Sequence, residues 1–166
     1  MTPGVAVDLG SGGGLPGLVL AVAWPATRWS LVEGSTRRAG FLEEAVRALE
    51  LADRVVVDQR RAEEVGRDPA ARGSAGLVVA RGFGPPAVVA ECAAPLLEIG
   101  GLVVVSGVPA EGSTDRWPDD EMAPLGLVAE RLVRVGGSGY RVLRQASPCP
   151  DRYPRRPGLP RRKPLF

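Results

Sequence analysis

The chain has 166 residues, of which 45% are apolar and 24% are charged, so it is long enough for one domain with a buried core. It contains no histidine and only two cysteines, which excludes a Cys-His or Ser-His catalytic pair and nearly excludes a zinc site. The net charge of +2 is unevenly distributed, because residues 151–166 carry six basic side chains and one acid while the rest of the chain is slightly acidic. A basic end of this kind favours an anionic partner.

The longest apolar run, at 15–24, is interrupted by Pro16 and Gly17 and is too short to cross a bilayer. The first residues also lack the charged start of a secretory signal. We therefore expect a cytoplasmic protein with no membrane contact and no bound metal, and the sequence predicts no particular oligomeric state.

Short apolar runs alternate with segments of helical periodicity over most of the chain. The first strand is predicted at Val5-Ala6-Val7, and a helix is expected from Leu15 with Pro16 in its first turn. Ser35 is expected to cap a second helix, whose apolar face comprises Phe41, Leu42, Ala45, Val46 and Leu49. A later helix presents Val88, Val89, Cys92, Ala93, Leu96 and Leu97, and it is followed by a turn at Gly100-Gly101. The remaining strands of this part are predicted at 29–33, 55–57, 77–80 and 102–105.

This alternation predicts an α/β fold with a doubly wound, mostly parallel sheet. Near the end of the chain, residues 127–135 and 140–143 flank a glycine-rich turn, which predicts a terminal antiparallel hairpin, and 108–118 is expected to be a surface loop. Right-handed crossovers place every loop that follows a parallel strand at the same edge of the sheet. We expect a ligand-binding domain over 1–147 and a basic tail rich in proline and arginine over 148–166.

A glycine cluster directly after the first strand carries the main functional signal. The segment reads Asp8-Leu9-Gly10-Ser11-Gly12-Gly13-Gly14-Leu15-Pro16-Gly17, and it is followed by Glu33, 21 residues after Gly12. Glycines here let the backbone approach a ligand, and Glu33 is placed to accept hydrogen bonds from ribose hydroxyls. The spacing suits either NAD or S-adenosyl-L-methionine. Asp8 favours the second, because a carboxylate suits a cationic amino group and repels a pyrophosphate, and the lack of a histidine proton shuttle argues against a dehydrogenase.

Several motifs together resemble one bacterial family. They are the glycine segment with its Leu-Pro-Gly extension, Arg37-Arg38 followed by Phe41-Leu42, Arg61-Ala62-Glu63-Glu64, Ala80-Arg81 and the run Arg152-Tyr153-Pro154-Arg155-Arg156-Pro157-Gly158-Leu159-Pro160. In these the chain resembles the ribosomal RNA small subunit methyltransferase G family, also called glucose-inhibited division protein B, over essentially its whole length.

The resemblance implies a seven-stranded, Rossmann-like class I methyltransferase sheet and transfer of a methyl group from S-adenosyl-L-methionine to N7 of a guanine in 16S ribosomal RNA, either naked or in the 30S subunit. Gly10 and Leu15 would line the cofactor turn, Ala62 and Glu63 would frame the adenine, and Arg81 would close the site. Neutral guanine carries a lone pair on N7, so the reaction needs positioning rather than a general base. We therefore assign no catalytic acid or base.

The basic tail is expected to contact RNA as an extended chain, with its cations along phosphates and its one aromatic ring against a base. A solvated tail without a ligand is the alternative. The residues assigned to RNA are Arg152, Tyr153, Arg155, Arg156, Arg161, Arg162 and Lys163.

The chain departs from the family pattern in two respects. The family has a helical segment before the first strand, whereas here that strand begins at Val5, and we expect its absence to leave part of the sheet and the cofactor mouth uncovered. Ser106 stands where the family commonly has lysine, which is expected to weaken RNA binding. The alternatives are therefore a class I methyltransferase for another RNA or a small molecule, or a truncated, non-catalytic RNA-binding module.

Overall fold

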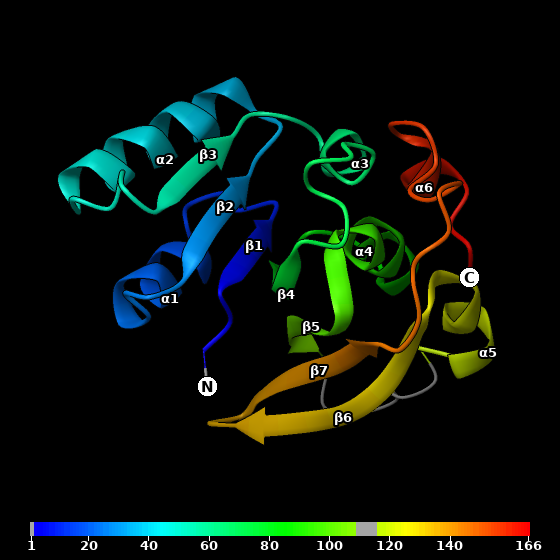
Figure 1. Cartoon of the computed structure of the whole chain (residues 1–166). Helices are drawn as coiled ribbons and strands as arrows, with labels where there is room; N and C mark the ends of the chain where they lie inside the picture. The colour runs from blue at the N-terminus through cyan, green and yellow to red at the C-terminus, as the bar shows by residue number, and fades with distance from the viewer. Residues whose placement is uncertain (1, 109–115) are drawn as a thin grey trace.

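A computed structural model describes residues 2–108 and 116–166, and it is built on a single seven-stranded sheet (Figure 1). The strand order is β3-β2-β1-β4-β5-β7-β6. The first five strands are parallel to one another, and β7 runs antiparallel to both β5 and β6. This confirms the predicted α/β sheet with its terminal hairpin. The strands are β1 Val5–Leu9, β2 Arg28–Val32, β3 Val55–Asp58, β4 Ala75–Arg81, β5 Leu97–Val108, β6 Leu127–Val135 and β7 Ser138–Gln145.

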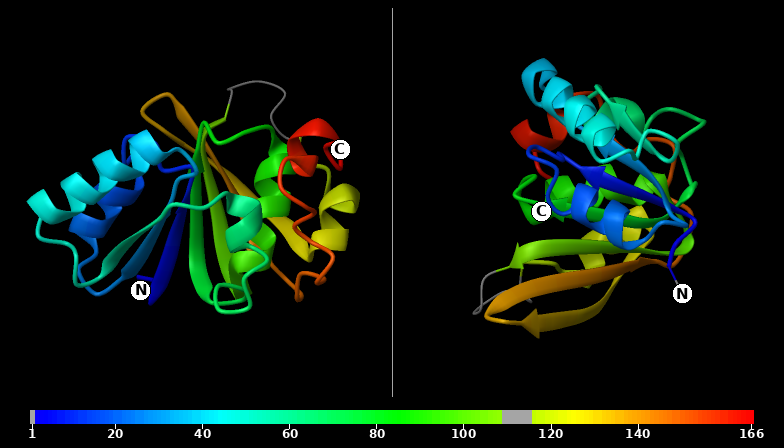
Figure 2. Two further views of the ribbon diagram at one scale, coloured as in Figure 1. Left: turned by 90° about the horizontal axis from the view of Figure 1, so that it is seen from above. Right: turned by 90° about the vertical axis from the view of Figure 1, so that its left-hand side faces the viewer.

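Helices cover the two faces of the sheet unequally (Figure 2). Helices α1 and α2 lie on one face, over β1, β2 and β3, and α3 to α6 lie on the other face. No helix within 2–108 and 116–166 is long and apolar enough to cross a membrane. The helices are α1 Gly17–Ala23, α2 Thr36–Ala48, α3 Ala62–Val65, α4 Pro86–Ala93, α5 Asp119–Met122 and α6 Leu159–Arg162, with 3-10 turns at Ala94–Leu96 and Ala123–Leu125.

Each face of the sheet has its own apolar core. On the side of α2, Leu42 and Val46 pack with Trp29 and Leu31 of β2. The larger core on the opposite side lies under α4 and α5, and it includes Cys92, Leu96, Val103, Met122, Leu125 and Leu143. The loops that follow β1 to β4 lie at the carboxyl ends of these strands, which is where a ligand-binding loop cluster forms in such sheets.

The predicted helix over 88–97 is shorter than expected, because α4 ends at Ala93 and the strand that follows begins at Leu97. Pro95 explains the difference, since its ring and missing N–H do not fit a helix interior. Gly100 and Gly101 consequently lie inside β5 rather than before it, at an irregularity in its pairing with β4.

The second helix was predicted with too wide an apolar face. Leu42 and Val46 are buried as expected, but Phe41 is 54% exposed and Leu49 is also exposed, because only one stripe of α2 reaches the sheet. Ser35 occupies the N-cap position, although its side chain makes no capping hydrogen bond. Helix α1 begins two residues later than Leu15, since turns occupy the end of the glycine segment.

Of the loop predicted over 108–118, residues 109–115 lie outside the described part of the chain. Trp117, near its end, is buried in the core beside Met122 and is not a surface residue.

Candidate functional site

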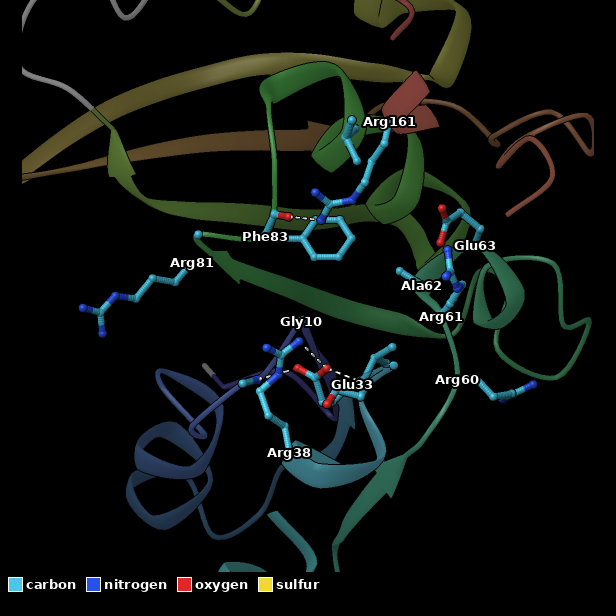
Figure 3. Close-up of a pocket in the computed structure, with 16 residues that line it drawn as sticks. Gly10, Glu33, Arg38, Arg60, Arg61, Ala62, Glu63, Arg81, Phe83 and Arg161 are labelled. Carbon is cyan, nitrogen blue, oxygen red and sulfur yellow. Dashed lines mark hydrogen bonds and ion pairs between the residues drawn. The ribbon is translucent and has the colours of Figure 1, made fainter. Parts of the chain in front are cut away.

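A cavity of about 570 Å³ opens at the carboxyl ends of β1 to β4 (Figure 3). Loops after four parallel strands meet there, as expected for this sheet topology. Its lining combines glycine backbone, two acids and five arginines: Gly10, Gly12, Val32, Glu33, Gly34, Ser35, Arg38, Arg60, Arg61, Ala62, Glu63, Arg81, Gly82, Phe83, Val88 and Arg161. Six of the eight residues predicted to bind the cofactor therefore lie together, namely Gly10, Gly12, Glu33, Ala62, Glu63 and Arg81.

The glycine turn forms the floor of the cavity. Gly10 and Gly12 have φ values of +68° and +55°, a left-handed conformation that strains other residues. The N–H groups of Gly10 and Ser11 donate to the carbonyl of Val32, at 2.9 and 3.1 Å, which ties the turn to β2. A Cβ atom on Gly10 would stand 2.7 Å from the ring of Phe83. The absence of a side chain thus allows Phe83 to close over the turn.

Glu33, directly after β2, is the central acid of the cavity. Its Oε2 accepts a hydrogen bond from the N–H of Gly12 at 3.0 Å, and its Oε1 accepts from Ser35 N and Arg38 Nη2 at 2.8 and 2.9 Å. Burial raises the pKa of Glu33, but these hydrogen bonds together hold the pKa below its usual value. A carboxylate offers about four lone-pair sites, so three named bonds leave one for a ligand hydroxyl.

Asp8 was predicted to face the cationic end of the cofactor, but the structure places it behind the turn and not in the cavity lining. The residue is 1% exposed, and its Oδ2 accepts a hydrogen bond from Gly17 N at 3.0 Å. Burial raises the pKa of Asp8 to about 6, against the opposing effects of the hydrogen bonds from Gly17 and Ser11, and nearby Glu33 raises it further. Asp8 therefore fixes the start of α1 relative to β1. Leu15 is likewise absent from the lining and is 52% exposed.

The opposite wall of the cavity comes from α3. Ala62 and Glu63 are both buried, and at the start of α3 the side chain of Glu64 accepts a hydrogen bond from the N–H of Arg61. The Oε1 of Glu63 accepts a hydrogen bond at 3.0 Å from the N–H of Gly158, 95 residues further along the chain. This wall is therefore completed by the C-terminal segment.

The C-terminal segment packs on the domain instead of extending from it. Arg155 donates three hydrogen bonds to the fully buried carboxylate of Glu91, from its backbone N–H, Nε and Nη2, at 2.7 to 2.8 Å. Arg161 lies over the ring of Phe83 at 5.7 Å and donates to the carbonyl of the same residue. Tyr153, predicted to stack on an RNA base, is 9% exposed and belongs to the large core.

Ten of the sixteen lining residues were not predicted to bind the cofactor. Among them are Arg38, Arg60 and Phe83, and also Arg161, which was assigned to RNA. Arg38 lies within the Arg37-Arg38 motif, whose spacing after Glu33 could have revealed it as a partner of that acid. Phe83 lies two residues after Arg81, and its uncharged ring gives no signal in the sequence that marks it as a site residue. Arg60 lies beside the predicted motif at 61–64, and Arg161 reaches the cavity only through the packing of the C-terminal segment.

The strand order and the position of the cavity are those of the class I methyltransferase fold. Solved structures of this class are similar to the chain in fold. An O-methyltransferase from neocarzinostatin biosynthesis, in complex with S-adenosylmethionine, gives a TM-score of 0.67 at 18% identity, over 86% of this chain and 49% of the other. TYW2 from M. jannaschii, in complex with AdoMet, gives a TM-score of 0.63 at 16% identity, over 84% of this chain and 66% of the other.

The family follows from the sequence comparisons. A family model described as rRNA small subunit methyltransferase G matches residues 2–111. Two curated proteins named ribosomal RNA small subunit methyltransferase G are 37% and 31% identical, from Pelotomaculum thermopropionicum and Dictyoglomus thermophilum. Each alignment spans 96% of this chain, and 69% or 68% of the relative. The chain belongs to the rRNA small subunit methyltransferase G family.

Proposed function

We propose that this protein transfers the methyl group of S-adenosyl-L-methionine to N7 of a guanine in 16S ribosomal RNA, acting in the cytoplasm on the RNA or the 30S subunit. The observation that carries the proposal is the cavity at the carboxyl ends of β1 to β4, in a chain of this family.

The residues present fit the cofactor. The left-handed turn at Gly10 and Gly12 exposes backbone for close approach, and Glu33 keeps one lone-pair site for a ribose hydroxyl. Ala62 and Val88 offer apolar surface for a flat ring. When bound, S-adenosyl-L-methionine supplies an electrophilic methyl group on a sulfonium centre.

Replacing Glu33 with alanine should lower the affinity for S-adenosyl-L-methionine roughly tenfold or more, because a hydrogen bond to a charged group contributes about 1.5–3 kcal/mol. Calorimetric titration measures the change, and Glu44→Ala, an exposed acid on α2 outside the cavity, is the matched control. Equal affinities for the two variants would show that Glu33 does not hold the cofactor.

The proposed reaction needs no general acid or base from the protein. Guanine N7 attacks with its own lone pair, and the chain has no histidine to act as a base. The cavity residues bind and orient, so the rate enhancement comes from holding the donor and acceptor at short distance in line. The five arginines around the cavity favour an anionic substrate such as RNA.

The direct test is incubation with methyl-labelled S-adenosyl-L-methionine and either 30S subunits or naked 16S RNA, followed by mapping of the methylated nucleotide. We expect label at N7 of one guanine. Label on another RNA or on a small molecule would replace the proposed substrate, and cofactor binding without transfer would indicate a non-catalytic RNA-binding module.

Exposed cations on the C-terminal segment are the proposed RNA contacts, and they include Arg152, Arg156, Arg162 and Lys163. The Arg156→Gln/Arg162→Gln variant should bind RNA more weakly, and its affinity should fall less steeply with salt, because each lost phosphate contact removes about 0.7–0.9 from the log–log slope. The control is Arg28→Gln/Arg47→Gln, which removes two exposed arginines from other parts of the surface. Unchanged salt slopes for the first variant would argue for a solvated segment without RNA contacts.

A further inference from the structure

Three polar side chains form a row across β4, β5 and β7. Arg81 pairs with Ser106, and Ser106 pairs with Tyr140, in the register of the sheet. Directly paired residues on neighbouring strands place their side chains on the same face. The row lies at the carboxyl ends of β4 and β5, the same edge as the cofactor cavity.

The row closes one end of a second cavity. A groove of about 950 Å³ runs along the face of the sheet below it, and its size suits a small-molecule ligand. The groove is mainly apolar, with Glu98 as its one acid at the end far from the row, and its walls include Leu20, Trp24, Leu77, Val79, Leu102 and Val104. Arg81 lines both this groove and the cofactor cavity, so the two meet at its position.

Ser106 carries the second observation. Its Oγ is buried and has no hydrogen-bond partner among the residues that the structure describes. A buried hydroxyl without a partner is unfavourable, because it has lost its hydrogen bonds to water and gained none in return. A hydroxyl can both donate and accept, and a ligand with polar edges would satisfy it.

We propose that Arg81, Ser106 and Tyr140 hold the guanine nucleotide that receives the methyl group. This inference rests on the proposed function, since it names the acceptor subsite of the same reaction. The glycine turn, Glu33 and α3 line the cofactor cavity on the β1–β3 side of β4, and Arg81 is the lining residue that it shares with the groove toward β5. The row of Arg81, Ser106 and Tyr140 supplies polar side chains on the β5 side of the cofactor cavity. Arg81 would then lie between the cofactor and the guanine.

The chemistry of the row fits a nucleotide better than a peptide or a lipid. The half-buried ring of Tyr140 gives a base a surface for stacking. An arginine next to it can bind a phosphate or the acceptor edge of guanine, and the side chain of Arg81 extends away from the floor of the cofactor cavity in Figure 3. The Ser106 hydroxyl supplies the remaining polar contact.

The test compares Ser106→Ala, Tyr140→Leu and Tyr140→Phe with the natural chain in single-turnover methyl transfer at subsaturating 16S RNA. We expect Ser106→Ala and Tyr140→Leu to be about tenfold slower, the loss of one hydrogen bond or one stacked base. Tyr140→Phe should retain most of the rate, since it keeps the ring. The affinity for S-adenosyl-L-methionine should stay within twofold for all three.

Two further measurements exclude a merely structural role. Ser106→Ala removes an unpartnered hydroxyl, so its Tm should be unchanged or higher while its rate falls. Ser74→Ala, at the opposite end of β4, is the matched serine control and should leave the rate unchanged. Normal rates for Ser106→Ala and Tyr140→Leu, or a parallel loss of cofactor affinity, would overturn the inference.

If the natural chain does not methylate ribosomal RNA, the proposed function fails. A second experiment then tests the guanine nucleotide site on its own. Guanosine 5′-monophosphate is then titrated into isotope-labelled protein with S-adenosylhomocysteine, and amide shifts are followed by NMR. Shifts at Ser106, Gly107 and Tyr140 that are absent with cytidine 5′-monophosphate would support a guanine nucleotide site. No shifts there would overturn the site together with the proposed function.

Discussion

The Arg155→Met variant should lose about 3–5 kcal/mol of unfolding free energy, because it leaves a buried charge without its partner. Glu91 is completely buried in α4, and three hydrogen bonds from Arg155 reach its two carboxylate oxygens. The substitution removes the two side-chain bonds and keeps only the backbone N–H. Methionine preserves the aliphatic volume, so the expected change comes from the lost charge.

Urea unfolding measures this change, with Arg156→Met as the matched control, since Arg156 is the exposed neighbour in the same segment. The control should stay within about 0.5 kcal/mol of the natural chain. The double variant Glu91→Leu/Arg155→Met should recover much of the loss, because it removes both charges. A single variant as stable as the control would mean that the ion pair contributes nothing to the fold.

The same variant should also affect the cofactor cavity. The segment held by Arg155 supplies the Gly158 N–H to Glu63 and lays Arg161 over Phe83, both in the cavity lining. Loosening the segment therefore weakens two walls of the cavity. Weaker cofactor binding under conditions where the variant is still folded would distinguish this connection from simple loss of stability.

The floor of the site was predictable from the sequence because its determinants are local. The strand, the left-handed glycines and Glu33 all lie within one strand–helix–strand unit, where spacing alone places the acid beside the turn. Ala62, Glu63 and Arg81 came from the family resemblance, and the cavity brings all three to the same lining.

The packing of the C-terminal segment against the domain could not be predicted from local sequence patterns. Composition showed its charge, but an arginine that pairs with a buried glutamate 64 residues earlier has the same sequence signature as one that meets solvent. Tyr153 was assigned to RNA for the same reason, since an aromatic ring among arginines suits a base as well as a core. Only the packing of the segment onto α3 and α4 separates these outcomes.

Asp8 shows that the residues of one motif can have separate structural parts in the site. The acid at the end of β1 was predicted to meet the ligand, yet its carboxylate turns back to the N–H of Gly17. A Cβ atom on Gly17 would stand 2.5 Å from that carboxylate, so the glycine is required for the contact. The motif therefore encodes the geometry of the turn, which in turn exposes the backbone that lines the cavity.

The position of Asp8 predicts an unusual dependence of stability on pH. The folded protein binds a proton at Asp8 with a pKa of about 6, against 3.8 for the free side chain, so it holds that proton more tightly than the unfolded chain does. The neutral carboxyl favours folding at low pH, and this contribution is lost as pH rises through about 6.

Asp8→Asn keeps an acceptor for Gly17 and cannot ionise, so it isolates the effect of this one proton. Relative to that variant, the natural chain should lose about 2 kcal/mol of stability between pH 4.5 and pH 7.5, the larger part of a full span of about 3 kcal/mol. Urea unfolding of both proteins at several pH values measures the difference, in which all the other titrating groups cancel. A difference that stays constant across this range would show that Asp8 is ionised in the folded protein throughout, and that the turn at Gly17 holds a carboxylate rather than a carboxylic acid.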